Sequence, residues 1–245
     1  LQNKIVERWK VAPPAEILQL ALTAGTLESR SSYKLLAGII SNYDTSALIR
    51  DAVLSSLQDQ EYTFLKHLTS SGVKTQTPGN EIFIEMLTTS IVRKRNPAEL
   101  SSLLTMLEVG PERFGWKEKS ILTAISIQGS NRKMKPIRLT NAPRILVAKN
   151  TNLDTTRLYS LNAMFEWPGH VADTTSLQKQ KRLSDAEQLQ FASGRQHYLT
   201  ACAGCHGTDG AGTNRMAPTL IGSDWVLGDE KRLALKEEST QKQLT

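Results

Sequence analysis

The sequence predicts an all-α chain in which a long array of paired helices precedes a smaller C-terminal helical domain. Apolar residues recur three and four positions apart through most of residues 14–127, which is the period of an amphipathic helix. Gly and Pro separate these stretches as turn signals. Alternating runs typical of strands are scarce, and residues 145–148 are the best short candidate for one.

The elements of the N-terminal part follow in order from such signals. Pro14 is a helix-start proline followed by good helix formers, and Trp167-Pro168-Gly169 ends the last of the series. The periodicity predicts helices over 14–21, 32–43, 45–57, 61–68, 81–95, 97–107, 117–127 and 153–165.

Grouping these helices in pairs gives repeat starts near residues 14, 45, 79 and 115. The starts are separated by 31, 34 and 36 positions, a spacing typical of two-helix solenoid repeats. Residues 1–128 therefore resemble a stacked array of HEAT type. Because sequence identity between the repeats is weak, an irregular helical bundle stays open as the alternative.

The amino-acid composition of the chain changes after the array. Residues 129–153 are basic, polar and interrupted by proline, and residues 170–183 are polar and repetitive, as in an exposed linker. Ser184 and Glu187 form a capping box, which starts a new helix. We therefore expect a HEAT-like helical region over 1–160, a linker over 161–183, and a second domain over 184–245.

Composition excludes several classes of protein. Two cysteines are too few for a disulfide scaffold, and no apolar run approaches the roughly 20 residues of a transmembrane segment. The net charge of +6 comes from scattered basic groups without interleaved aromatics, so we expect no nucleic-acid partner. The chain opens at Leu1 without a leader, so we expect that any signal peptide was removed or was never part of this sequence.

Both cysteines lie in one pentapeptide, Cys202-Ala203-Gly204-Cys205-His206. This is C-x-x-C-H, the attachment motif for c-type haem. Thiols at this spacing are near enough to the two vinyl groups of a porphyrin edge to form thioethers, and His206 follows as the axial ligand of the iron. Half a zinc site is disfavoured because no second cysteine pair exists, and a thioredoxin-like pair because these cysteines follow a helix.

The residues that follow the motif are also those expected beside a bound haem. Pro218 lies twelve residues after His206, and its carbonyl oxygen is expected to accept a hydrogen bond from the second ring nitrogen of that ligand. Three glycines at 207, 210 and 212 supply a tight loop, and Asp209 is interpreted as a turn former.

These residues carry a resemblance to a known family. Residues 184–235 resemble the N-terminal half of a class I cytochrome c domain, as in the stretch from Gly194 through Cys202-Ala203-Gly204-Cys205-His206-Gly207. The wider arrangement is similar to bacterial haem-binding CxxCH proteins of the planctomycete, or PVC, membrane-bound dehydrogenase type. Residues 48–57 and 222–228 carry that wider similarity. The resemblance implies haem c, iron and a dehydrogenase module elsewhere.

The sequence departs from the cytochrome pattern after the motif. Met216 is the sole Met among the 39 residues after His206, and it would have to cross to the opposite haem face within ten residues. We therefore do not expect Met216 to be the sixth iron ligand. His170 and His197 are conceivable substitutes. Residues 231–245 are polar where a closing helix is expected, so the haem domain is expected to be truncated.

The sequence thus predicts a one-electron transfer protein, with the helical array as a docking scaffold for a redox protein or dehydrogenase. Covalent haem implies a periplasmic or other extracytoplasmic location, with membrane association through partners. We find no catalytic residues, so this chain is not expected to be an enzyme by itself. The alternatives are an interaction protein with a vestigial cytochrome domain and a ligand-binding haem sensor.

Overall fold

The computed structural model describes residues 5–70, 73–108, 114–129, 135–147, 153, 155–172, 184–212 and 217–227. The chain divides into two units, Leu1–Leu189 and Gln190–Thr245. Helices dominate the described residues of both units, and strands contribute only two short segments. The predicted all-α class is therefore confirmed.

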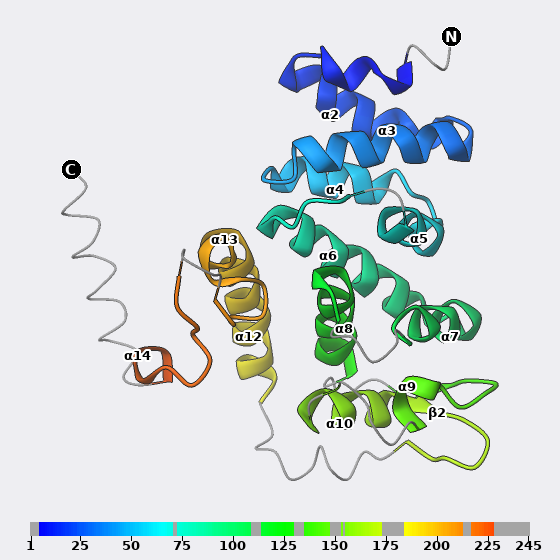
Figure 1. Ribbon diagram of the computed structural model, residues 1–245, viewed down its shortest axis with the longest axis vertical. Coiled ribbons are helices and arrows are strands. Elements are labelled where there is room, and N and C mark those ends of the chain that lie inside the picture. The colour runs from blue at the N-terminus through cyan, green and yellow to red at the C-terminus, as the bar shows by residue number, and fades with distance from the viewer. Residues whose placement is uncertain are drawn as a thin grey trace. The chain divides into compact units, whose positions relative to one another are not determined.

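The first unit is a succession of helices that pack on their neighbours. Figure 1 follows them from α2, close to the N-terminal end, to α10. Helix α6 packs on α5 and α8, α2 packs on α4, and α8 packs on α10. The elements are η1 (Arg8–Lys10), α2 (Pro14–Thr23), η2 (Ala24–Thr26), α3 (Ser29–Asn42), α4 (Ala47–Ser55), α5 (Glu61–Ser70), α6 (Pro78–Lys94), α7 (Pro97–Met106), α8 (Trp116–Gly129), α9 (Arg144–Val147) and α10 (Thr155–Met164).

Local capping explains where several of these helices begin. The side chain of Ser46 accepts a hydrogen bond from the Ile49 amide at 3.3 Å, and Asn96 accepts one from Ala98 at 3.1 Å. Such caps satisfy amide groups that have no partner inside the helix. Proline occupies the first turn of α2, α6 and α7, where its missing amide hydrogen costs nothing. The predicted helix starts at Pro14, Glu61 and Pro97 agree with the structure, whereas those predicted at 32, 45, 81 and 117 lie one to three residues from the observed starts.

The prediction of a strand at residues 145–148 is wrong, because Arg144–Val147 forms the short helix α9. Its first amide, that of Arg144, donates to the Glu108 carboxylate at 2.9 Å. The strands instead are β1 (Ile137–Arg138) and β2 (Phe165–Glu166), which pair in parallel. Two-residue strands are too short for an alternating pattern to reveal.

One hydrophobic cluster runs through the first unit from Ala12 to Trp167. Leu161 and Phe165 are fully buried in it, and Trp167 is 8% exposed. The predicted start of the linker at 161 is therefore wrong, since these apolar side chains complete the core. The polar stretch that suggested a linker falls largely on residues 173–183, which lie outside the described residues.

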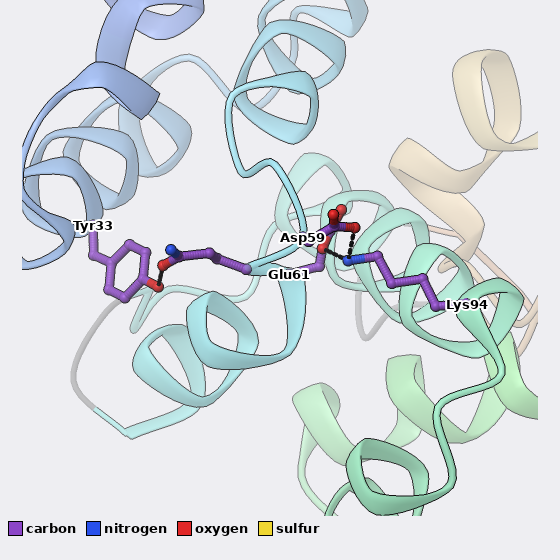
Figure 2. A network of polar contacts seen from close by, with 5 residues as sticks. Tyr33, Asp59, Glu61 and Lys94 are labelled. Carbon is purple, nitrogen blue, oxygen red and sulfur yellow. Dashed lines mark hydrogen bonds and ion pairs between the residues drawn. The ribbon is translucent and has the colours of Figure 1, made fainter.

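A network of polar contacts links α3 and α6 to the turn before α5 and to the first residue of α5 (Figure 2). The ammonium group of Lys94, at the end of α6, forms ion pairs with Asp59 at 2.7 Å and with Glu61. Burial opposes the charge of Lys94, but the hydrogen bonds to both carboxylates outweigh burial and raise the pKa of Lys94. The hydroxyl of Tyr33 in α3 donates to the side chain of Gln60.

The turn that carries this network is strained. Gln58 and Asp59 both have positive φ, at 44° and 75°, although neither is glycine. The Gln60 amide closes the turn by donating to the Leu57 carbonyl at 3.0 Å. The ion pairs of Asp59 and Glu61 with Lys94 therefore help to hold a backbone conformation that the local sequence disfavours.

The cysteine motif lies near the end of a helical segment. Helix α12 (Asp185–His197) runs on from the last residues of the first unit into the second unit. A π-helical turn, η3 (Tyr198–Cys202), and the short helix α13 (Ala203–His206) follow, and α14 (Asp224–Leu227) comes later. The capping box predicted at the start of α12 is confirmed: the Glu187 amide lies 3.3 Å from Ser184 Oγ, and the Ser184 amide 2.7 Å from the Glu187 carboxylate.

Candidate functional site

The two cysteines and His206 lie where the helical segment ends. Cys202 closes the π-helical turn and is partly exposed, whereas Cys205 lies in α13 and is exposed. Between them Ala203 is buried, and a side-chain carbon added at Gly204 would meet nothing within 4 Å. The backbone therefore presents both cysteines with little side-chain bulk between them.

Three glycines determine the backbone conformation of the loop after His206. Gly207, Gly210 and Gly212 have φ of +76°, +75° and +82°, a region that other L-residues rarely adopt. Gly207 caps α13 by donating its amide to the Ala203 carbonyl at 3.0 Å. The tight loop predicted from these glycines is present. Asp209 forms the predicted turn, since its carboxylate accepts from the Ala211 amide at 3.0 Å.

The structure brings His206 and Pro218 together. His206 Nδ1 lies 2.9 Å from the Pro218 carbonyl oxygen. A carbonyl oxygen only accepts, so this contact requires the ring proton on Nδ1 and leaves the lone pair on Nε2. The segment around Pro218 is tied to the glycine loop, because Leu220 donates its amide to the Gly210 carbonyl at 2.8 Å. The Gly212 amide in turn donates to the carbonyl of His206 at 2.8 Å.

Two side chains missed as site residues also contact this loop. The Tyr198 hydroxyl donates to the Gly207 carbonyl at 2.5 Å, and the Arg195 guanidinium donates to the Thr208 carbonyl at 2.6 Å. Burial raises the pKa of Tyr198 although the charge of Arg195 opposes this shift, so the hydroxyl keeps its proton at neutral pH. Their i, i+3 spacing on one helical face is the only sequence signal that could have found them.

The side chains of this site fit haem c. Two thiols at least partly exposed would provide the atoms for thioether bonds, and the Nε2 lone pair of His206 would provide one ligand to the iron. Four large apolar side chains of the unit are exposed, so apolar surface is available for a porphyrin: Phe191, Ile221, Val226 and Leu227.

The three residues considered as the sixth ligand lie in different parts of the chain. Met216 lies outside them. His197 is exposed at the end of α12. His170 belongs to the first unit, where its ring stacks on Trp167 with centroids 3.9 Å apart.

A C-x-x-C pair that is at least partly exposed, followed by a histidine whose Nδ1 faces a carbonyl oxygen, is the arrangement expected of a c-type cytochrome. The comparisons agree, because residues 191–245 match the family Cytochrome c. The second unit thus contains a cytochrome c domain, which implies covalently bound haem c and indicates electron transfer. No curated protein and no solved structure matches the chain. In the part of the chain that the structure describes, no helix is long and apolar enough to span a membrane.

Proposed function

We propose that the chain binds one haem c through thioethers to Cys202 and Cys205, with His206 as axial ligand, and that it transfers single electrons. The bound haem supplies the one-electron couple between ferric and ferrous iron. The protein fixes the ligand and provides the surface through which partners approach. No residue of the chain is assigned a catalytic role.

The observation that carries this proposal is the contact between His206 and Pro218. At 2.9 Å from a carbonyl oxygen, Nδ1 keeps its proton, and Nε2 is the nitrogen left for iron. The carbonyl also makes the imidazole a more basic ligand. Cys202 and Cys205 precede this histidine by four residues and one residue, with little bulk between them.

The burial pattern of the second unit also supports a bound prosthetic group. Among the residues of this unit whose burial is described, Ala203 is the one buried apolar side chain, whereas Phe191, Ile221 and Leu227 are more than half exposed. A unit with so little buried apolar surface gains stability from any group that binds only its folded state. A covalently held porphyrin would cover apolar surface of this kind.

The first unit is proposed to be a HEAT-like docking scaffold for a redox protein or dehydrogenase, as in the PVC-type haem-binding proteins that the sequence resembles. The continuous cluster from Ala12 to Trp167 favours such a rigid array. Because haem c is attached outside the cytoplasmic membrane, the proposed location is periplasmic or otherwise extracytoplasmic. Membrane association would then come from the partner.

The test is to export the full chain in a bacterium that attaches haem c and to measure its intact mass. We expect the mass of one haem and a Soret band that survives acid-acetone extraction. Replacing both thiols, as Cys202→Ser with Cys205→Ser, should abolish both signals, because no other cysteine exists in the chain.

Gly204→Ala is the matched control, since the added carbon meets nothing within 4 Å and both thiols stay in place. This variant should retain the haem. A wild-type chain exported to the same compartment without a covalent tetrapyrrole would contradict the proposal and favour an interaction protein with a vestigial cytochrome domain.

A further inference from the structure

The loop after the axial histidine is held by two side chains that no part of the C-x-x-C-H motif requires. Gly207 and Thr208 directly follow His206, and at the end of a helix their carbonyl groups have no partner inside the helix. Tyr198 donates to the first carbonyl at 2.5 Å and Arg195 to the second at 2.6 Å. Both donors come from the helical segment that precedes the motif.

The two donors also support each other. The Arg195 guanidinium carbon lies 5.9 Å from the centre of the Tyr198 ring, within the range of a cation–π contact. Tyr198 is only partly exposed, and the carbonyl of Thr208 belongs to a residue that is 4% exposed. Hydrogen bonds with this degree of burial hold their geometry better than fully exposed ones.

A short chain of contacts leads from this pair of donors to the ligand nitrogen. The loop that they hold continues to Gly210, whose carbonyl accepts from the Leu220 amide at 2.8 Å and from the Thr219 hydroxyl at 3.2 Å. Thr219 follows Pro218, whose carbonyl contacts His206 Nδ1. Displacing the loop would therefore displace the carbonyl that fixes the imidazole.

We propose that Arg195 and Tyr198 are positioning residues for the axial ligand: by holding residues 207–210 they keep the Pro218 carbonyl against His206 Nδ1. This inference rests on the proposed function. It goes beyond the haem motif because it assigns part of the control of the reduction potential to two side chains outside the C-x-x-C-H pentapeptide. A weaker Nδ1–H to carbonyl bond makes the imidazole less electron-rich, which favours ferrous iron and raises the potential.

The experiment compares full-length, haem-loaded variants. Tyr198→Phe removes only the hydroxyl, Arg195→Leu removes the guanidinium, and Arg195→Lys keeps one cationic donor. Gln196→Ala is the matched control, because Gln196 is exposed on the same helix. Two quantities are measured: the reduction potential, and the hydrogen exchange rate of the Gly212 amide, which donates to the His206 carbonyl.

We expect Tyr198→Phe and Arg195→Leu each to favour reduction by about threefold, which is about 28 mV at 59 mV per tenfold for a one-electron couple. Exchange at Gly212 should accelerate about fivefold, as for the loss of one neutral hydrogen bond. Arg195→Lys should restore most of both values. Gln196→Ala should leave both unchanged.

An unchanged potential in Tyr198→Phe and Arg195→Leu would overturn the inference, since a merely structural role predicts lower stability at constant potential. The failure of the proposed function looks different, because the wild-type chain would then carry no haem mass at all. In that case the positioning role is tested by the hydrogen exchange rate of the Gly212 amide alone. Equal rates in the wild type and both variants would refute it.

Discussion

Replacing Gly212 with alanine should destabilise the cytochrome c domain by about 2 kcal/mol. The φ of +82° costs an L-residue about 1 kcal/mol. The added carbon would also lie 2.7 Å from the Ala217 carbonyl oxygen and 2.8 Å from Pro218. To reach an ordinary contact, residues 217–219 must move by about 0.7 Å, which weakens the His206–Pro218 contact by roughly another 1 kcal/mol.

Two other glycines separate these contributions. Gly222 has a φ of +70°, but an added carbon there would meet nothing within 4 Å, so Gly222→Ala reports the backbone cost of about 1 kcal/mol alone. Gly194 lies in α12 with no atom within 4 Å of an added carbon. Gly194→Ala should therefore stabilise the domain by up to about 1 kcal/mol through helix propensity.

The assay is denaturant unfolding of the haem-loaded full chain, followed through the haem absorbance because this signal reports the cytochrome c domain. The ranking of midpoints should be Gly194→Ala above wild type, then Gly222→Ala, then Gly212→Ala. Equal midpoints for Gly212→Ala and Gly222→Ala would refute the argument, since the approach of residues 217–219 would then contribute nothing.

Three further predictions concern the helices of the first unit and the start of α12. Lys94→Met should cost about 2 kcal/mol by urea unfolding because it leaves the Glu61 carboxylate buried without its cation, whereas Lys66→Met on an exposed site should cost little. The pKa of Lys94 is raised in the folded state. The Lys94 ion pairs therefore contribute fully to the free energy of unfolding below the unfolded lysine pKa of about 10.4, and this stabilisation is lost as pH rises through the pKa of Lys94 in the folded state. Gln58→Gly should stabilise the unit by about 0.5–1 kcal/mol by relieving a φ of 44°, and an unchanged or lower melting temperature would contradict the strain. Ser184→Ala should remove about 1 kcal/mol from the start of α12, seen as faster amide exchange at Glu187, and equal rates would count against the cap.

Local chemistry explains what the sequence predicted well. Helix starts such as Pro14 and Pro97 follow from residue types that act within the first turn of the helix. The capping box of Ser184 acts over the same distance. The C-x-x-C-H motif is likewise local, because attachment depends on residue types at fixed short spacings. Features of this kind can be predicted without knowledge of the tertiary structure.

Features that depend on distant partners were missed. The β1–β2 pair joins Arg138 to Glu166, 28 positions apart, through strands too short to show a period. The positive φ of Asp59 goes with an ion pair to Lys94 on another helix, and no glycine marks this turn. Leu161 was assigned to a linker although it is fully buried, because burial depends on the whole unit and not on the neighbouring polar residues.

The candidate site also combines features set by neighbouring residues with features set by distant ones. The pentapeptide ending at His206 contains the residue types that we propose to hold haem, but it does not decide which ring nitrogen of His206 carries the proton. That is decided by the Pro218 carbonyl twelve positions away, which reaches Nδ1 at 2.9 Å. This carbonyl is in turn placed by a loop with glycine at positive φ and by carbonyl contacts from Arg195 and Tyr198. A chain with an intact motif and a disturbed loop should therefore still attach haem while holding the axial ligand less firmly, so haem content and reduction potential report different parts of the sequence.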